Sequence, residues 1–284
     1  MPENRRELET SIHVELQKGG TYGDYLHLDE LLAAQRPVTA VHDEMLFIIQ
    51  HQTSELWIKL LLHELDFAVG LVRDDRLGES FKVFARVAHI QRMLFEQWSV
   101  LETMTPSEYV QFRDSLGKSS GFQSYQYRAL EFVLGNKDAN TLRPHQHEPQ
   151  VYGELSRRLA APSLYDEFLR WLARHGHAIP ADRVERDFTQ PYERSAAVLE
   201  VFRLIYADPA RNYDAYDMCE KLVDVEERFQ LWRFRHMTTV KRIIGFAHGT
   251  GGSSGVGFLK KALDLTFFPE LWDVRTHIAS PRQP

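Results

Sequence analysis

Two long segments of this sequence, roughly 41–73 and 211–245, place apolar residues three and four positions apart, and this spacing constrains the fold more than any other feature. The spacing gives a helix one apolar face, whereas a half-buried strand needs apolar and polar residues in alternation. Alternating runs bounded by turn residues are almost absent. We therefore predict an all-α fold.

Shorter segments with the same spacing predict further helices, at roughly 27–35, 79–103, 106–116, 122–134, 152–160, 163–174, 193–206 and 256–265. One of them has a well-defined start, because Thr105 suits the N-cap, Pro106 the first helical position and Glu108 the capping box. Gly117 suits its end. Segments 143–150 and 175–182 are predicted loops. No repeat or sharp change of composition marks a boundary, so we expect residues 1–284 to form a single domain.

Composition and charge exclude several classes of function. The chain has 284 residues, of which 43% are hydrophobic, and this is enough for a sizeable core. A net charge of −6 without a basic stripe argues against a nucleic-acid partner. Its longest apolar stretches fall far short of the roughly 18 residues that a membrane span needs. The start of the chain has no secretory pattern, and the single cysteine, Cys219, forms no internal disulfide. We expect a soluble protein of the reducing cytoplasm, with Cys219 a buried, inert thiol.

Each of the two long helices carries one histidine within an apolar stripe. His51 shares its face with Phe47, Ser54, Ile58, Leu61 and Leu65, and His236 with Leu222, Val225, Phe229, Trp232, Thr239 and Ile243. Apolar residues on the other side of the first helix, namely Leu46, Ile49, Leu56 and Leu60, predict burial on more than one side.

Two explanations suit such histidines. Each is either a core residue satisfied by a carbonyl group or an axial haem ligand, because a neutral imidazole in an apolar slot binds iron through one nitrogen. No Cys-x-x-Cys-His motif occurs, so a haem would be held without covalent attachment. The pairs His145/His147 and His175/His177 are weaker metal candidates, and no His-Glu-x-x-His motif supports a zinc protease.

Two further features suggest binding. Tyr109 and Arg113 lie four apart on one helix face and suit an anionic group, since a guanidinium grips a carboxylate in a planar fork. The alternative is a surface arginine whose stem covers Phe112 or Tyr109. The glycine-rich stretch 249–257 follows a helix and lacks the lysine of a phosphate-binding loop. It is either a mobile loop that closes over a site or a plain linker.

Four stretches in this order resemble the tryptophan 2,3-dioxygenase family. They are Phe47-Ile48-Ile49-Gln50-His51-Gln52-Thr53-Ser54-Glu55-Leu56-Trp57, Glu96-Gln97-Trp98-Ser99-Val100-Leu101-Glu102-Thr103, Trp232-Arg233-Phe234-Arg235-His236-Met237 and Gly249-Thr250-Gly251-Gly252-Ser253-Ser254-Gly255. The likeness runs from about Tyr22 to Arg275 and is weakest between about 137 and 160. It implies a haem enzyme that opens the indole C2–C3 bond of L-tryptophan with O2 and yields N-formyl-L-kynurenine, the first step of tryptophan catabolism through kynurenine.

The resemblance also implies roles for individual residues. His236 is similar to the proximal iron ligand of a noncovalent haem b, one per subunit, and His51 to the catalytic distal histidine that accepts a hydrogen bond from the indole N–H. The other matched positions are Tyr109 and Arg113 as carboxylate clamp, Phe47 as indole pocket, Thr250 at the amino-acid end, and Ser120 and Gly121 as cofactor-binding wall near the haem edge. Whether His51 acts as a base or only orients the substrate stays open.

Tyr22, Tyr25 and Leu26 match a substrate-binding N-terminal arm, residues 1–26, that in the family enters the neighbouring subunit's site. This implies a homotetramer whose subunits exchange segments. Three other functions remain compatible with the residues. They are a haem dioxygenase of broader indoleamine specificity, a haem sensor or inactive relative that binds tryptophan, and an all-α scaffold without a cofactor.

Overall fold

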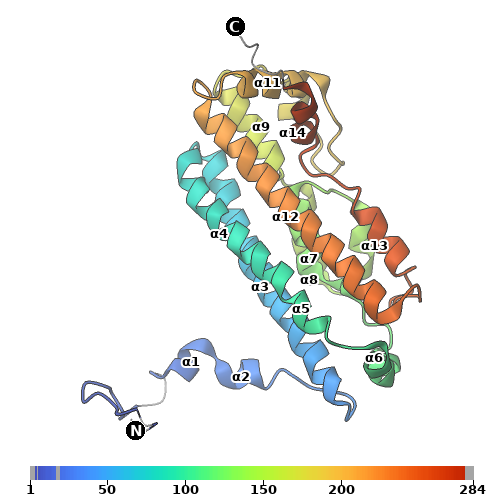
Figure 1. Ribbon diagram of the computed structural model, residues 1–284. Helices are drawn as coiled ribbons and strands as arrows, with labels where there is room; N and C mark the ends of the chain where they lie inside the picture. Colours follow the sequence, from blue (N-terminus) through green and yellow to red (C-terminus); the bar gives the residue numbers. More distant parts are fainter. Residues whose placement is uncertain (1–3, 5, 17–19, 279–284) are drawn as a thin grey trace.

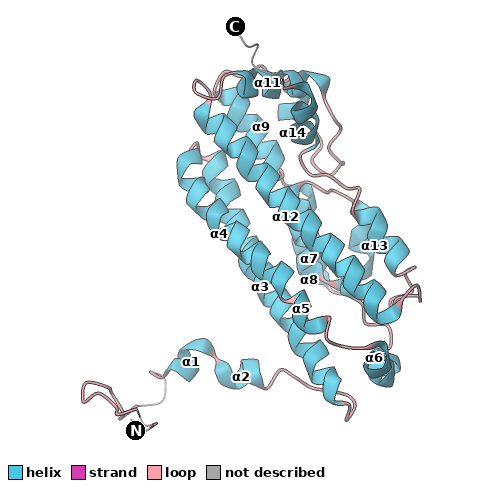
Figure 2. Cartoon of the chain, in the orientation of Figure 1, coloured by secondary structure: helices cyan, strands magenta, loops and turns pink. Residues whose placement is uncertain are grey.

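A bundle of long helices runs through the whole molecule (Figure 1). The computed structural model describes residue 4 and residues 6–16 and 20–278, and every regular element in these residues is a helix (Figure 2). The two longest, α3 (His42–Arg73) and α12 (Tyr213–Ile244), have 32 residues each. Both pack along α4 (Leu77–Glu96), which returns antiparallel to α3 after a tight turn. The predicted all-α class is confirmed.

The predicted apolar stripes of α3 and α12 are buried in one core, with α4 packed against both helices. Leu61, Leu65, Leu222 and Val225 are almost fully buried, together with Phe229 one turn further on. The prediction that α3 is buried on a second side holds only in part for the single chain, because Leu46 packs against the core whereas Ile49, Leu56 and Leu60 are 47%, 50% and 37% exposed. No described element of the chain covers that side of the helix enough to bury them.

Smaller helices enclose the other sides of the bundle, with α7 and α9 packed on α3 and α13 packed on α12. Their bounds are α7 (Tyr125–Leu134), α8 (Pro149–Ala160), α9 (Leu164–Arg174), α10 (Ala181–Val184), α11 (Ala196–Ala207), α13 (Val256–Ala262) and α14 (Pro269–Asp273). Short 3-10 turns are η1 (Asp114–Leu116), η2 (Gly121–Gln123), η3 (Ala139–His145) and η4 (Val274–His277). Most predicted helices lie within a few residues of observed ones.

Several sequence boundaries differ from the structure. The predicted helix 79–103 is two helices, since Gln97 separates α4 from α5 (Trp98–Leu101). The predicted loop 143–150 is shorter in the structure, because the 3-10 helix η3 extends to His145 and α8 starts at Pro149. Asp138 caps η3 through its side chain, and Pro149 suits a first helical position.

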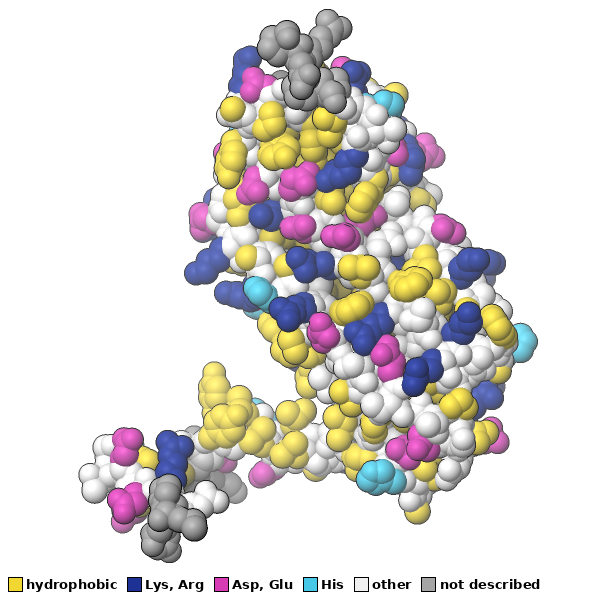
Figure 3. Space-filling model, in the orientation of Figure 1, with side chains coloured by type: hydrophobic (Ala, Val, Ile, Leu, Met, Phe, Trp, Pro, Cys, Tyr) yellow, Lys and Arg dark blue, Asp and Glu magenta, His cyan; other side chains and the backbone are white. Residues whose placement is uncertain are grey.

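The N-terminal segment leaves the bundle at the end where α3 begins (Figure 1). It contains α1 (Tyr22–Leu26) and α2 (Leu28–Leu32), separated by His27 in a left-handed conformation, and neither helix has a buried residue. Figure 3 shows hydrophobic side chains gathered on this projecting segment. None of the helices in the described residues is long and apolar enough to cross a membrane.

Candidate active site

Most of the sequence-predicted site residues lie at the end of the bundle from which the N-terminal segment departs. Here α3, α5 and α12 meet α6 (Pro106–Arg113), whose start has the predicted capping box at Thr105 and Glu108. Figure 1 shows α5 and α6 at this end, beside the first turns of α3. The glycine-rich loop between α12 and α13 completes the region.

The ring of His51 has one nitrogen occupied and the other available. Its Nδ1 lies 2.7 Å from the carbonyl oxygen of Phe47, one turn back along α3. A carbonyl only accepts hydrogen bonds, so Nδ1 carries the proton and Nε2 keeps its lone pair. Burial lowers the pKa of His51 below its usual 6.5, while the Phe47 carbonyl and the Glu55 carboxylate partly offset this effect. The imidazole is therefore neutral at neutral pH.

His236 faces the same region from α12 and is held by aromatic rings. Its imidazole stacks on Trp98, with ring centroids 4.8 Å apart and planes 12° apart, and lies 5.6 Å from the ring of Trp232. Neither ring nitrogen has a hydrogen-bond partner among the described residues. Burial, with a smaller electrostatic contribution from His51, lowers the pKa of His236 to about 4. The ring thus has a free lone pair and lies within electrostatic range of His51.

An aromatic wall leads from His51 to the predicted carboxylate clamp. The Phe47 ring lies 4.2 Å from the ring of His51 and 5.9 Å from that of Tyr109, measured between centroids. Phe112 closes the wall from behind, 5.6 Å from Phe47 and fully buried. Burial raises the pKa of Tyr109, and the adjacent Arg113 guanidinium partly offsets this rise. Arg113 is half-buried, and its Nε is buried and unpartnered among the described residues, so the side chain is not fully spread over the surface.

The glycine-rich loop folds back onto the wall of the same site. Arg113 donates from Nη2 to the carbonyl of His248 at 2.5 Å, and Thr250 donates from Oγ1 to the carbonyl of Ser119. Gly251 passes so close to Ser120 that an added Cβ would lie 2.6 Å from the serine Cβ. The loop therefore packs against Arg113 and against the residues around Ser120.

The comparison with known protein families decides the assignment. The model of the tryptophan 2,3-dioxygenase family matches residues 7–204 and 200–278, which is nearly the whole chain. This chain belongs to the tryptophan 2,3-dioxygenase family. The family predicted from the four sequence motifs is therefore confirmed.

Similar proteins from three bacteria carry the name tryptophan 2,3-dioxygenase. The protein of Myxococcus xanthus is 66% identical over 99% of this chain and 97% of its own length. That of Serratia proteamaculans is 60% identical over 98% of this chain and all of its own length. That of Kineococcus radiotolerans is 58% identical over 98% of each chain. Each of these three alignments therefore covers nearly the full length of this chain and of the relative.

Most of the positions matched to the family lie together, but some do not. Gly121 starts η2 beside Ser120, and nothing lies within 4 Å of a Cβ added there. Tyr22 and Tyr25 are 76% and 85% exposed on the projecting segment, away from their own chain's site, and Leu26 beside them is 39% exposed. These three side chains therefore do not contribute to the site of the chain that carries them.

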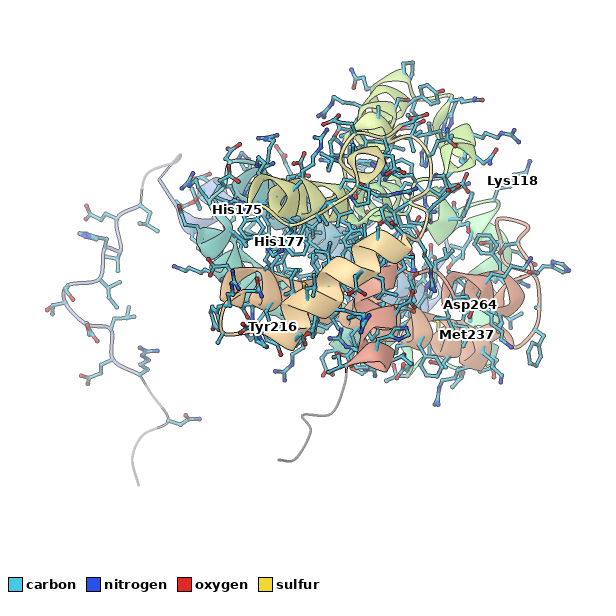
Figure 4. All side chains as sticks on the ribbon, turned by 90° about the horizontal axis from the view of Figure 1, so that it is seen from above. Lys118, His175, His177, Tyr216, Met237 and Asp264 are labelled. Atoms are coloured by element: carbon cyan, nitrogen blue, oxygen red, sulfur yellow. The ribbon has the colours of Figure 1, made fainter. Side chains whose placement is uncertain are left out.

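The weaker metal candidates gain no support from the structure. In the part of the chain that it describes, no three His, Cys, Asp or Glu side chains gather as a metal site requires. Figure 4 shows His175 and His177 well away from Met237, the chain neighbour of His236. Cys219 is fully buried, as predicted, and burial raises the pKa of its thiol well above the usual range.

Sequence reasoning missed the residues that support His236. Trp98 and Glu102 both lie in the motif from Glu96 to Thr103, but the sequence assigns neither a role, although Glu102 binds Arg235 on the turn that carries His236. Because Trp98 follows Phe95 by three residues, the sequence indicates only one more apolar position on the same helix. Only the break between α4 and α5 at Gln97 turns it toward α12.

Proposed function

We propose that this chain is a haem-dependent dioxygenase that cleaves the indole C2–C3 bond of L-tryptophan with O2, giving N-formyl-L-kynurenine as the first step of tryptophan breakdown through kynurenine. Its family supplies the reaction class. One observation carries the assignment of the site. The unpartnered imidazole of His236 lies close enough to His51 for the two rings to interact electrostatically, the Nε2 of His51 is free, and Tyr109 lies along the same wall beside Arg113.

The residues present fit a haem held without covalent attachment. His236 would supply the axial nitrogen, since its ring is neutral, unbonded among the described residues and packed between aromatic rings. Cys219 is no competing ligand, because its thiol is fully buried in the core. We infer one haem b per subunit, with Ser120 and Gly121 in the wall near its edge. When bound, the haem supplies the binding and activation of O2, which reacts sluggishly with closed-shell molecules.

The side chains of this protein would place the substrate. Arg113 and Tyr109 would bind the tryptophan carboxylate, and the Nε2 of His51 would accept the indole N–H. Phe47 would pack against the indole, and Thr250 would hold the amino-acid end while its loop covers the site. Because Arg113 already contacts the loop backbone at His248, the clamp and the cover would act together.

We further infer a homotetramer whose subunits exchange their N-terminal arms, with Tyr22, Tyr25 and Leu26 entering the neighbouring site. The exposure of these apolar side chains, together with the exposed apolar side of α3, supports an assembly that buries them. One hydrophobic cluster joins α3, α4, α7, α9 and α12, which supports a single domain over residues 1–284. The cytoplasm remains the proposed location.

Purified protein tests this function directly. We expect a haem absorption spectrum that shifts on addition of tryptophan, and N-formylkynurenine when tryptophan, O2 and a reductant are supplied together. The His236→Ala variant should lose haem on gel filtration, whereas His51→Ala should keep it and turn over slowly. Native haem content and turnover in the His236 variant would refute the ligand assignment.

The same preparation separates the other functions. A coloured protein that binds tryptophan without forming product would be a sensor or an inactive relative. Equal turnover of tryptophan and of tryptamine, which has no carboxylate, would indicate a broader indoleamine dioxygenase. A protein that purifies colourless, with no haem uptake on reconstitution, would be a scaffold.

A further inference from the structure

The stretch from Glu96 to Thr103 is one of the four that resemble the family, yet nothing in the proposed chemistry uses it. It contains α5, which contacts both α3 and α12, the two helices that carry the site histidines. The stretch therefore lies where it can determine how His51 and His236 face one another.

Trp98 supplies the contact that orients the His236 ring. Its indole is 5% exposed and lies nearly parallel to the imidazole, at 4.8 Å between centroids. A histidine bound to a metal usually has its plane fixed by a hydrogen bond from its second nitrogen. His236 has no such acceptor among the described residues, so ring contacts restrain its rotation, and the nearly parallel face of Trp98 is the closer of them, since Trp232 lies 5.6 Å away and tilted.

Glu102 holds the backbone turn on which His236 sits. Its carboxylate accepts two hydrogen bonds from Arg235, each at 3.0 Å, and one from the hydroxyl of Thr239 at 2.9 Å. Because Arg235 and Thr239 flank His236 on either side, sliding or rotation of α12 would break these bonds. At the other end of α5, Gln97 donates from Nε2 to the hydroxyl of Ser54 at 2.8 Å.

We propose that Trp98 is a positioning residue that fixes the plane of the His236 imidazole, while Glu102 fixes the register of α12 behind it. The proposal rests on the proposed function, in which His236 ligates haem iron. The orientation of the imidazole plane governs its overlap with the iron orbitals. Loss of the stacked ring should therefore alter the iron–histidine bond before it alters the fold.

The molecule contains a matched control. Trp171 is 6% exposed and stacks on His175 with centroids 4.0 Å apart, far from the site. We would compare Trp98→Leu, Trp98→Phe and Trp171→Leu in the haem-loaded full chain. The readouts are the iron–histidine stretching band in the ferrous resonance Raman spectrum and the rate of haem transfer to apomyoglobin.

We expect Trp98→Leu to shift or broaden the iron–histidine band. It should also speed haem loss by about tenfold, because removal of a group that orients a metal ligand usually weakens metal binding by at least that factor. Trp98→Phe should restore most of the native band, because it keeps an aromatic face. Trp171→Leu should lower the unfolding temperature and leave both readouts native. Where Trp98→Leu does not fold, Glu102→Gln replaces it and should broaden the band.

A native band and a native haem-loss rate in folded Trp98→Leu, or in Glu102→Gln where that variant is used, overturn the proposal. An equal change in Trp171→Leu also overturns it, because the effect would then be general loosening. A different result would refute the proposed function itself, namely a His236→Ala variant that keeps its haem and its iron–histidine band.

Discussion

Burial keeps His51 neutral, and a neutral ring is what its proposed role requires. The folded pKa lies below the usual 6.5, so protonation of Nε2 begins only below that pH. We expect kcat/KM to be flat near neutral pH and to fall as acid protonates His51, because the protonated ring no longer accepts the indole N–H.

Two variants check this pH profile. His51→Ala should keep its haem, lose activity and lose this acidic limb. Glu55→Gln should move the limb to lower pH, since the Glu55 carboxylate raises the pKa of His51. An acidic limb that persists unchanged in His51→Ala would show that another group titrates.

Arg113 is predicted to act on the substrate carboxylate alone. Arg113→Ala should raise KM for tryptophan by about a hundredfold, as expected for loss of a charge-assisted hydrogen-bond pair, and should leave haem content native. KM for tryptamine should hardly change. Gln111→Ala, on an exposed position of the same helix, is the control. Steady-state kinetics with both substrates provide the measurement, and an unchanged KM for tryptophan would contradict the clamp.

Lys137 makes stability depend on pH. The residue is 1% exposed, its Nζ donates to the carbonyls of Arg158 and Ala161, and burial lowers its pKa from 10.5 to about 7. Between these two values the unfolded chain binds more protons than the folded one, so the free energy of unfolding should rise with pH from about 7 to 10.5.

Urea midpoints across this pH range test the effect of Lys137. We expect Lys137→Met to lose most of the rise, and to be the less stable protein at high pH because two carbonyls lose their donor. Lys118→Met, at an exposed position labelled in Figure 4, should follow the native profile. The same rise in Lys137→Met as in the native protein would assign the pH dependence to other groups.

At the level of elements, the glycine-rich loop depends on backbone geometry that a side chain does not tolerate. Gly255 has φ of 59° and ψ of −119°, and an added Cβ would lie 2.6 Å from the carbonyl oxygen of Ala247. Gly255→Ala should therefore displace the loop and raise KM for tryptophan by about tenfold, in line with the usual cost of such strain, with haem content unchanged.

Gly153 provides the control for this substitution. It lies exposed in α8 with nothing within 4 Å of an added Cβ, so Gly153→Ala should leave KM native and raise stability by about 1 kcal/mol. Kinetics and thermal unfolding of both variants distinguish a loop effect from a general one. Native KM in Gly255→Ala would mean that the loop takes no part in binding.

For the whole molecule, arm exchange predicts complementation between two defective chains. Tyr25→Ala damages only the arm and Arg113→Ala only the pocket, so each homo-oligomer should be poorly active. Co-expressed chains that exchange arms in pairs would form sites with an intact pocket from one chain and an intact arm from the other. If the two chains pair at random, about a quarter of the sites combine an intact pocket with an intact arm, so about a quarter of native activity should return. No activity above that of the separate variants, in oligomers shown to contain both chains, would mean that arms are not exchanged.

Local spacing determined much of this protein by itself. Helical periodicity depends only on near neighbours along the chain, so the stripes of α3 and α12, the capping box at Thr105 and the pairing of Tyr109 with Arg113 were all predictable. The motifs around His51 and His236 also indicated the family. Their proximity across two helices, by contrast, follows from how α3, α4 and α12 pack, which periodicity does not encode.

Only the tertiary structure decided which side chains support the site and which leave it. Trp98 reaches His236 because the chain breaks at Gln97, and the glycine loop packs beside Arg113 because Thr250 finds a carbonyl far away in sequence. Tyr22 and Tyr25 are exposed because no other described part of the chain covers them. The reason is common to all three: contacts between distant segments depend on helix breaks and packing angles, whereas a sequence read locally specifies only the faces that are available to meet.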